Sequence, residues 1–339
     1  MSKLIVMVGL PGSGKSYKAK ELSDLYNAQI FSSDLYRKVM FGDENDQTHN
    51  EEVFKKLYSE LNIWLAVGKN CILDATNVTL KSRKKIFDNL TKENREKTQF
   101  IAYVMNTPIK ECIERDKERE RSVGIDVINK FYQSYQHPQK FEGFDDIIID
   151  EFGPFLIDGR EHFFFDSMTN FNQENPHHIY ALDEHCKRLS ICYTPNTDNL
   201  KQVNNTDLIK HIAGLFHDVG KLYTQKFDEN DVAHYYNHDS VGTYELISKL
   251  WYWYPNYSEF IDLDGLNEIL FYVNYHMRAH KDFLNPRAEN KYRNLFGDER
   301  FNSLIEFAEN DKKASGTYEV HDEILEKEKS KRMKFSEVI

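Results

Sequence analysis

A chain of 339 residues is long enough for two domains of ordinary size, and a hydrophobic content of 40% excludes a chain dominated by disorder. The formal net charge of −11 excludes a protein that coats nucleic acid non-specifically, because such binding needs a broad basic surface. The net charge is still compatible with an enzyme that binds a single nucleic-acid end in a local basic cleft. The cysteines show no CxxC pairing, which predicts a reducing compartment and neither a disulfide framework nor a structural zinc site: Cys71, Cys112, Cys186 and Cys192.

The apolar segments argue against targeting to a membrane. The first of them, residues 4–10, is too short for a signal sequence and leads straight into a glycine loop. No apolar segment approaches the length that spans a bilayer. We therefore expect a cytoplasmic protein that does not associate with a membrane.

The first 150 residues alternate between strand and helix patterns. Strands are expected at 3–8, 29–32, 70–73, 98–105 and 145–150, and helices at 15–26, 51–67, 81–91, 109–120 and 127–136. Strands that alternate with helices predict a mainly parallel sheet with helices on both faces. Beyond residue 152 the periodicity is lost, and the chain then shows helices with little strand. These patterns predict an α/β domain over 1–157, a linker over 158–175, an all-α domain over 176–325 and a charged tail over 326–339.

The first strand runs into a sequence that matches GxxxxGK[ST], and a helix pattern follows it. In such a loop the glycines let backbone N–H groups surround phosphates, the lysine reaches the outer phosphates, and the hydroxyl residue ligates Mg²⁺. The free N–H groups and the dipole of the following helix favour the same anion. The sequence therefore predicts a site for ATP, or another nucleoside triphosphate, with Mg²⁺. Its nucleotide-binding residues would be Gly9, Gly12, Ser13, Gly14, Lys15 and Ser16, with Ser16 on the metal and Lys15 acting in catalysis.

Two polar segments follow the next two predicted strands. In the first, Ser33-Asp34-Leu35-Tyr36-Arg37, Asp34 would accept a proton from an acceptor hydroxyl and Arg37 would hold a substrate phosphate. The alternative for Asp34 is a helix N-cap. In the second, Asp74-Ala75-Thr76-Asn77, three polar side chains would contact the substrate: Asp74, Thr76 and Asn77. The alternative for this segment is a strand-end cap and turn.

Arginines recur on the charged helix predicted at 109–120. Arg115 and Arg119 are spaced to lie on one helix face, and Arg121 follows just beyond. They would close as a lid on the donor phosphates. The alternative is a solvated ion-pair face shared with Glu114, Glu118 and Glu120.

Together these motifs resemble the kinase domain of polynucleotide 5′-hydroxyl kinases of the T4 phage type. The similarity covers about residues 3–135 and rests on GLPGSGKS, SSDLYR, DATN and ERDKERERSVGIDVI. It implies an α/β P-loop kinase domain in which Asp34 is the general base and Arg37 contacts the phosphate of the acceptor strand. It also implies that Arg119 contacts the donor phosphates. Because the lid segment differs in length by one residue, Arg121 is the alternative.

The second half carries an ordered series of metal-binding residue types. It contains a histidine, a His-Asp pair, two more histidines and an aspartate: His185, His217, Asp218, His238, His276 and Asp311. Imidazoles and carboxylates suit a divalent metal, and such an ion would acidify a bound water for attack on a phosphate ester. Lys221, one turn beyond Asp218, would steady the substrate phosphate. We interpret His211 and His280 as structural, and His234 as an exposed side chain despite its spacing from His238.

This series resembles the HD phosphohydrolase superfamily, an all-α metal-dependent fold, over about residues 176–315. The segments NPHHIYALDEHC, LFHDVGK and NHDSVG carry the similarity. It implies that His185, His217, Asp218 and Asp311 are the core ligands and that Asp218 is catalytic. His238 and His276 would hold a second metal or the substrate phosphate. The metal would be a divalent transition ion such as Mn, Ni, Zn or Fe, and Glu309 and Asp322 are alternatives to Asp311.

A 5′-hydroxyl kinase joined to an HD domain resembles the HD-type polynucleotide kinase-phosphatases, although in those the HD domain comes first. The combination predicts an enzyme that heals RNA or DNA ends and leaves them ready for a ligase. One alternative is a nucleoside or nucleotide kinase fused to a nucleotide phosphohydrolase. Another is that one half is a non-catalytic nucleotide sensor that regulates the other.

Overall fold

A computed structural model describes residues 1–44, 46, 48–150, 164–176, 178–194, 205–257, 261–281 and 285–316. The chain folds as two compact units, residues 1–154 and 155–339. Parts of the predicted linker, and the whole of the predicted tail over 326–339, lie outside the described residues, as does Asp322. No helix in the described part of the chain is both long and apolar enough to cross a bilayer.

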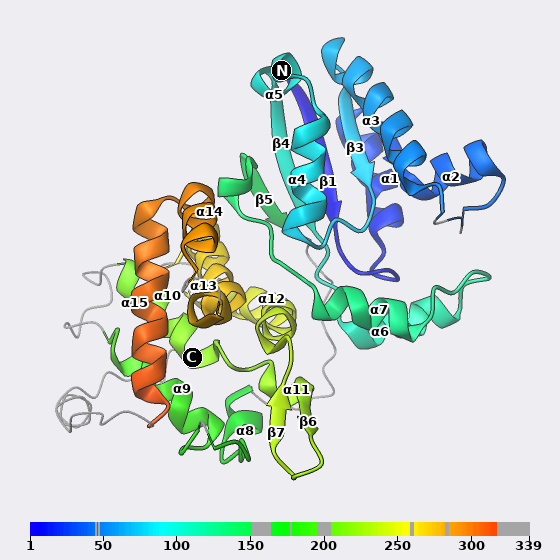
Figure 1. Cartoon of the computed structure of the whole chain (residues 1–339). Helices are drawn as coiled ribbons and strands as arrows, with labels where there is room; N and C mark the ends of the chain where they lie inside the picture. The colour runs from blue at the N-terminus through cyan, green and yellow to red at the C-terminus, as the bar shows by residue number, and fades with distance from the viewer. Residues whose placement is uncertain are drawn as a thin grey trace. The chain divides into compact units, whose positions relative to one another are not determined.

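Unit 1 is built on a five-stranded parallel sheet in the order β2-β3-β1-β4-β5 (Figure 1). The strands are β1 (Ser2–Val8), β2 (Ala28–Ser32), β3 (Asn70–Asp74), β4 (Thr98–Val104) and β5 (Asp146–Ile149). Their near-continuous apolar sequence is what a sheet covered on both faces requires. On one face, Ile5 and Met7 of β1 pack with Ala19 and Leu22 of the first helix. The predicted parallel sheet is confirmed.

Helices and one 3₁₀ turn complete unit 1. They are α1 (Lys15–Tyr26), α2 (Ser33–Phe41), α3 (Asn50–Ala66), α4 (Leu80–Asn89), α5 (Lys92–Lys97), α6 (Ile109–Lys117), α7 (Ile125–Gln133) and η1 (Lys140–Glu142). The predicted helix at 109–120 ends earlier, at Lys117. Beyond it, the Asp116 carboxylate accepts hydrogen bonds from Ser122 Oγ at 2.6 Å and from the Gly124 N–H at 3.0 Å. These bonds hold the connection to α7 as a compact turn.

Unit 2 is helical, with a single short hairpin among its described residues (Figure 1). Its elements are α8 (Phe164–Met168), α9 (Leu182–Ile191), α10 (Asn205–Phe216), α11 (Lys221–Thr224), β6 (Gln225–Phe227), β7 (Ala233–Tyr235), α12 (His238–Tyr257), α13 (Leu263–Lys281), α14 (Pro286–Phe296) and α15 (Asp298–Ala314). The predicted helical character of this region is confirmed, and the antiparallel pair β6–β7 is an addition.

Two glycines set the close helix packing of unit 2. A Cβ on Gly214 of α10 would lie 2.9 Å from the Cα of Ser190 on α9, and a Cβ on Gly220 would lie 1.9 Å from the His238 carbonyl oxygen. Such distances are below any real Cβ contact, so both positions require glycine. The first brings α9 against α10, and the second brings the start of α12 against the segment that follows α10.

Candidate nucleotide and metal sites

The glycine loop between β1 and α1 has the backbone that its sequence predicts. Gly12 and Gly14 have φ values of 80° and 88°, in the left-handed region that favours glycine. A Cβ on Gly12 would also lie 2.2 Å from the carbonyl oxygen of Cys112, at the point where α6 packs on the loop. The Ser13 hydroxyl is buried and has no hydrogen-bond partner within the described structure. A phosphate oxygen in the loop would supply one.

The charged groups of the loop face each other. The Lys15 ammonium donates to the Leu10 carbonyl at 2.7 Å, and burial lowers its pKa to about 8 although the charge of Asp74 opposes the shift. Burial raises the pKa of Asp74, which the hydrogen bond from Ser16 and the charge of Lys15 oppose. Asp74 therefore lies beside the predicted Mg²⁺ ligand, Ser16. This position suits support of the donor side better than the predicted contact with the acceptor.

Thr76 and Asn77 hold the end of β3 against the glycine loop. The Thr76 carbonyl accepts a hydrogen bond from the Gly9 N–H at 3.1 Å. Asn77 has a φ of 47°, and its amide donates to the Met7 carbonyl at 3.0 Å. These contacts match the cap-and-turn alternative. Their predicted role in substrate binding remains a prediction.

Asp34 and Arg37 form an ion pair on the first turns of α2. The Arg37 Nη1 lies 2.6 Å from the Asp34 Oδ1, with the arginine side chain 7% exposed and the carboxylate 58% exposed. The N-cap of α2 is Ser32, so Asp34 lies inside the helix, and the alternative that makes it the N-cap is wrong. Its charge acts on both Lys15 and Asp74. A candidate base therefore faces solvent within electrostatic range of the glycine loop.

The three lid arginines have different surroundings. Arg115 pairs with Glu111 at 2.7 Å, and its Nη1 would lie 3.4 Å from a Cβ on Gly14, so its guanidinium is next to the glycine loop. The charge of Arg119 acts on Lys15 and Asp74. Arg121 instead bonds Glu44, at 2.8 Å to the carboxylate and 3.0 Å to the carbonyl. Between Arg119 and Arg121, the geometry favours Arg119 as the residue that faces the donor phosphates.

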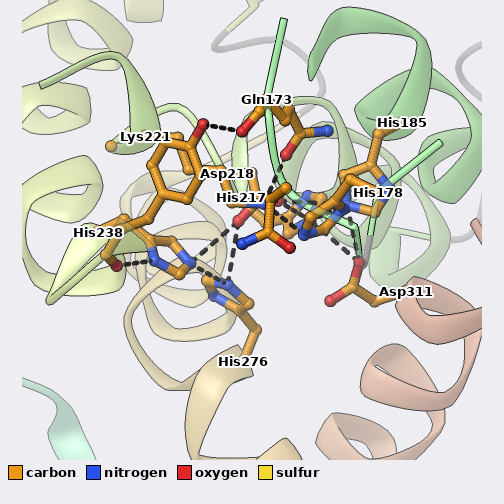
Figure 2. A network of polar contacts seen from close by, with 12 residues as sticks. Gln173, His178, His185, His217, Asp218, Lys221, His238, His276 and Asp311 are labelled. Atoms are coloured by element: carbon orange, nitrogen blue, oxygen red, sulfur yellow. Dashed lines mark hydrogen bonds and ion pairs between the residues drawn. The ribbon is translucent and has the colours of Figure 1, made fainter. Parts of the chain in front are cut away.

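In unit 2, the structure brings the six predicted metal-binding side chains into one buried cluster (Figure 2). They come from α9, the segment after α10, the first residue of α12, α13 and α15. Ligand atoms gather in two groups, and within each group all of them lie within 4.8 Å of one another. The first group is His185, His217 and Asp311, and the second is Asp218, His238 and His276.

Asp218 links the two groups because each of its carboxylate oxygens faces a different one. Oδ2 lies 3.2 Å from the Nε2 of His185 and 3.4 Å from that of His217. Oδ1 lies 3.1 Å from the Nε2 of His238 and 3.5 Å from that of His276. A carboxylate in this position can bridge two cations.

The histidine tautomers test whether a cation fits. His217, His238 and His276 each donate Nδ1–H to a backbone carbonyl, at 2.9, 2.7 and 2.8 Å. A carbonyl can only accept, so the neutral rings present a lone pair at Nε2. The Nε2 atoms of His238 and His276 are 3.3 Å apart. Two ligands about 2.1 Å from one ion at a tetrahedral angle would lie about 3.4 Å apart, so the donor set fits a metal.

The charges of the cluster also favour a bound cation. Although burial opposes the shift, Lys221 and His217 hold the pKa of Asp218 well below its usual range. Nearby histidines, His217 first among them, do the same for Asp311, and the carboxylates raise the pKa of His217 well above its ordinary value. Both carboxylates are therefore ionised at neutral pH and attract positive charge to the cluster, whether protons or a metal.

Outer contacts hold both carboxylates. The three N–H donors of the Lys221 ammonium have three acceptors: Asp218 Oδ2 at 2.6 Å, Gln173 Oε1 at 2.8 Å and His178 Nε2 at 3.0 Å. This arrangement favours a role in orienting Asp218 over the predicted contact with a substrate phosphate. On the other side of the cluster, His280 Nε2 lies 2.8 Å from Asp311 Oδ2.

Sequence reasoning missed Gln173, His178 and the contact of His280. His280 follows His276 by four residues on α13, and that helical spacing was the available signal. His178 lies in the segment NPHHIYALDEHC, and burial together with the charge of Lys221 lowers its pKa to about 3.

Two further histidines lie outside the metal cluster. His211 bonds Ser190 at 2.8 Å, and His234 pairs with Asp228 at 3.0 Å. Neither belongs to the two ligand groups.

One protein-family model matches the chain, and the matched residues all lie in unit 1. Residues 4–138 match the family model described as an AAA domain. No curated protein sequence matches the chain significantly.

Solved structures also match over part of the chain. A chain of the Pnkp1/Rnl/Hen1 RNA repair complex is 25% identical over 38% of this chain and 42% of that chain, with a TM-score of 0.34. A fungal RNA kinase is 17% identical over 45% and 39%, also at 0.34, and a shikimate kinase from Acinetobacter baumannii is 16% identical over 45% and 86%, at 0.32. This chain thus spans less than half the length of the first two.

Proposed function

We propose that this chain is a bifunctional enzyme that heals nucleic-acid ends in the cytoplasm. Unit 1 transfers the terminal phosphate of ATP, or of another nucleoside triphosphate, to the 5′-hydroxyl of RNA or DNA. Unit 2 is an HD-type phosphohydrolase that removes a 2′-phosphate, or opens and removes a 2′,3′-cyclic phosphate. The ends produced would suit a ligase. The proposal is supported most strongly by the presence of two sites in one chain. Unit 1 has a glycine loop near the Asp34–Arg37 ion pair, and unit 2 has two groups of histidine and carboxylate ligands that Asp218 links.

In unit 1, the donor would lie along the glycine loop with its outer phosphates at Lys15. Mg²⁺, held by Ser16 with Asp74 behind it, would neutralise charge that develops on those phosphates. Arg115 and Arg119 would add positive charge on the same side. Asp34 would take the proton of the accepting hydroxyl, because its exposed carboxylate reaches solvent while remaining in electrostatic range of Lys15.

In unit 2, the donor set of imidazole nitrogens and carboxylate oxygens suits a divalent transition metal such as Mn, Ni, Zn or Fe. Such an ion would polarise the phosphate ester and acidify a water at the site. The chain's own contribution is to hold the ligand atoms in place. Backbone carbonyls fix three imidazole tautomers, Lys221 orients Asp218, and His280 orients Asp311.

A buried arginine favours a phosphate-bearing acceptor over a free nucleoside. Arg37 is buried beside the exposed Asp34, so an acceptor that reaches the base would meet a fixed guanidinium. A nucleic-acid end carries a phosphate near its hydroxyl, whereas a nucleoside does not. The alternative, a nucleoside or nucleotide kinase fused to a nucleotide phosphohydrolase, keeps both sites and changes only the substrate.

The test uses an RNA with a 5′-hydroxyl and a 2′,3′-cyclic phosphate, incubated with ATP and Mg²⁺ or Mn²⁺. Wild-type protein should alter both ends, Lys15→Ala should lose only the 5′ reaction, and Asp218→Ala should lose only the 3′ reaction. Failure of the wild type to label any 5′-hydroxyl end would overturn the end-healing proposal. If Asp218→Ala changed the kinase rate and no hydrolysis existed to be lost, unit 2 would be a sensor instead.

A further inference from the structure

Arg37 is held on one edge by a residue that the sequence motifs do not include. The side-chain carbonyl oxygen of Asn50 accepts hydrogen bonds from Arg37 Nη2 at 2.7 Å and from Arg37 Nε at 3.3 Å. Asp34 accepts from Nη1 on the other side of the guanidinium. A buried arginine with partners on two edges has a fixed plane, because its guanidinium cannot rotate without losing one of them.

The position of Asn50 is itself well defined. It is the first residue of α3, and His49 just before it stacks on Phe41 at the end of α2, with ring centroids 4.2 Å apart and planes 13° apart. A second contact joins the same two helices, because the Tyr36 hydroxyl donates a hydrogen bond to Glu60. The two contacts hold α3 against α2, and Asn50 faces Arg37 from the first residue of α3.

The chemistry of the amide matters as much as its place. A carboxylate at residue 50 would bond the same two donors and would also neutralise the guanidinium. The neutral amide oxygen satisfies those donors without adding a second negative charge to the one that Asp34 already places beside Arg37. The positive charge of Arg37 faces Asp34 in this structure, where the accepting hydroxyl and its neighbouring phosphate would approach.

We propose that Asn50 is a positioning residue for acceptor binding: it fixes the Arg37 guanidinium so that this group holds the phosphate beside the accepting hydroxyl at Asp34. The inference rests on the proposed kinase function of unit 1. Asn50 itself does not contact the substrate and acts only through Arg37. Its effect should therefore appear with acceptors that carry a phosphate and vanish when Arg37 is absent.

The experiment measures 5′-phosphorylation of a short RNA and of free adenosine. Asn50→Leu should raise the KM for RNA about tenfold, as expected when hydrogen bonds to a charged group are lost, with little change in kcat or in the KM for ATP. Any transfer to adenosine should be unaffected. In the Arg37→Leu background, Asn50→Leu should add less than about twofold. Glu52→Gln, an exposed change on the same helix, is the matched control.

A second measurement does not depend on activity. The NMR signal of Arg37 Nε–H, assigned by its loss in Arg37→Lys, should exchange slowly in wild type and in Asn50→Asp, and rapidly in Asn50→Leu. Asn50→Asp should nevertheless raise the KM for RNA, because it places a second negative charge beside the guanidinium that would hold the phosphate.

An Asn50→Leu protein that folds, with unchanged KM and slow exchange, would overturn the role of Asn50 alone. Equal losses from Asn50→Leu with and without Arg37 would do the same. A wild-type protein that phosphorylates no phosphate-bearing acceptor would overturn the proposed function, and the role of Asn50 with it.

Discussion

The two candidate sites are assembled in opposite ways. The phosphate loop of unit 1 occupies eight consecutive residues, and its conformation follows from local rules: glycines with positive φ, then a helix whose free N–H groups point back at the loop. The cluster of unit 2 takes its residues from positions 185 to 311 on five segments. Local chemistry therefore specifies the first site, whereas helix packing creates the second. The two sites should respond differently to substitution, and this difference can be tested.

The largest expected effect comes from Asp218, because its two carboxylate oxygens face different ligand groups. Asp218→Ala should lower hydrolysis about a thousandfold or more and should reduce metal content at both groups, as measured by elemental analysis of purified protein. His276→Gln should affect the second group first. The kinase reaction should persist in both variants. Full retention of metal by Asp218→Ala would show that the carboxylate does not bridge.

A packing change far from any ligand atom should be nearly as damaging in unit 2. A Cβ on Gly220 would overlap the His238 carbonyl, so Gly220→Ala should displace His238 and cost more than about 3 kcal/mol of stability. Gly297→Ala is the comparison, because nothing lies within 4 Å of its Cβ position and its φ of 82° makes backbone strain the cost, whereas Gly220 has an ordinary φ of −63°. It should cost about 1 to 3 kcal/mol, from backbone strain alone. Urea unfolding and metal content would measure both, and equal costs would contradict the packing argument.

The outer contacts should have intermediate effects. Lys221→Met and His280→Leu each remove the partner of a carboxylate, and each should lower hydrolysis about 10- to 100-fold with a matching loss of metal affinity. His280→Gln should recover part of the loss because it can still donate to Asp311. His234→Gln should change neither quantity, since His234 pairs with Asp228 outside the cluster. Loss of substrate affinity without loss of metal in Lys221→Met would restore the phosphate-binding role.

The smallest effect concerns the proton on Lys15. Its pKa of about 8 in the free protein should rise when phosphates bind, because they favour the charged ammonium. Binding of ATP should therefore take up a fraction of a proton between about pH 7.5 and 9, where the free protein is partly deprotonated and the complex is not. Calorimetry in buffers of different ionisation enthalpy measures this uptake. Lys15→Arg, always charged, should show none of it, and an uptake that survives in this variant would assign the proton to another group.

Much of unit 1 could be predicted because its signals are short-range. Strand and helix periods located each strand to within one residue at either end, and the alternation of elements predicted the parallel sheet. Two features of unit 1 were not predicted, one of them local and the other dependent on helix packing. The sequence allows Asp34 as a helix N-cap, and the structure excludes that role because α2 begins at Ser33. Asn50 belongs to no motif, because its proposed role depends on where α3 packs against α2.

In unit 2, the sequence indicated which residue types would gather but not how they would pair. The order of His185, His217-Asp218, His238, His276 and Asp311 predicted a metal site, and the resemblance named a core set. Packing brings Asp311 beside His185 and His217, and turns the two oxygens of Asp218 toward different groups, so the assignment of ligands to individual ions stays a prediction. Neither arrangement has a sequence period, since the ligands of the first group alone run from position 185 to position 311.

By itself, the sequence determined the phosphate loop, the parallel sheet that carries it and the helical character of the second unit. Each depends on interactions within a few residues: φ preferences of glycine, hydrophobic period and capping. Only the tertiary structure decided the orientation of side chains across elements. It turned Lys221 inward to Asp218, placed His280 behind Asp311, and set Asn50 against Arg37. Helix crossings fix those contacts, and crossings depend on close approach at residues such as Gly214 and Gly220, whose partners are distant in the chain.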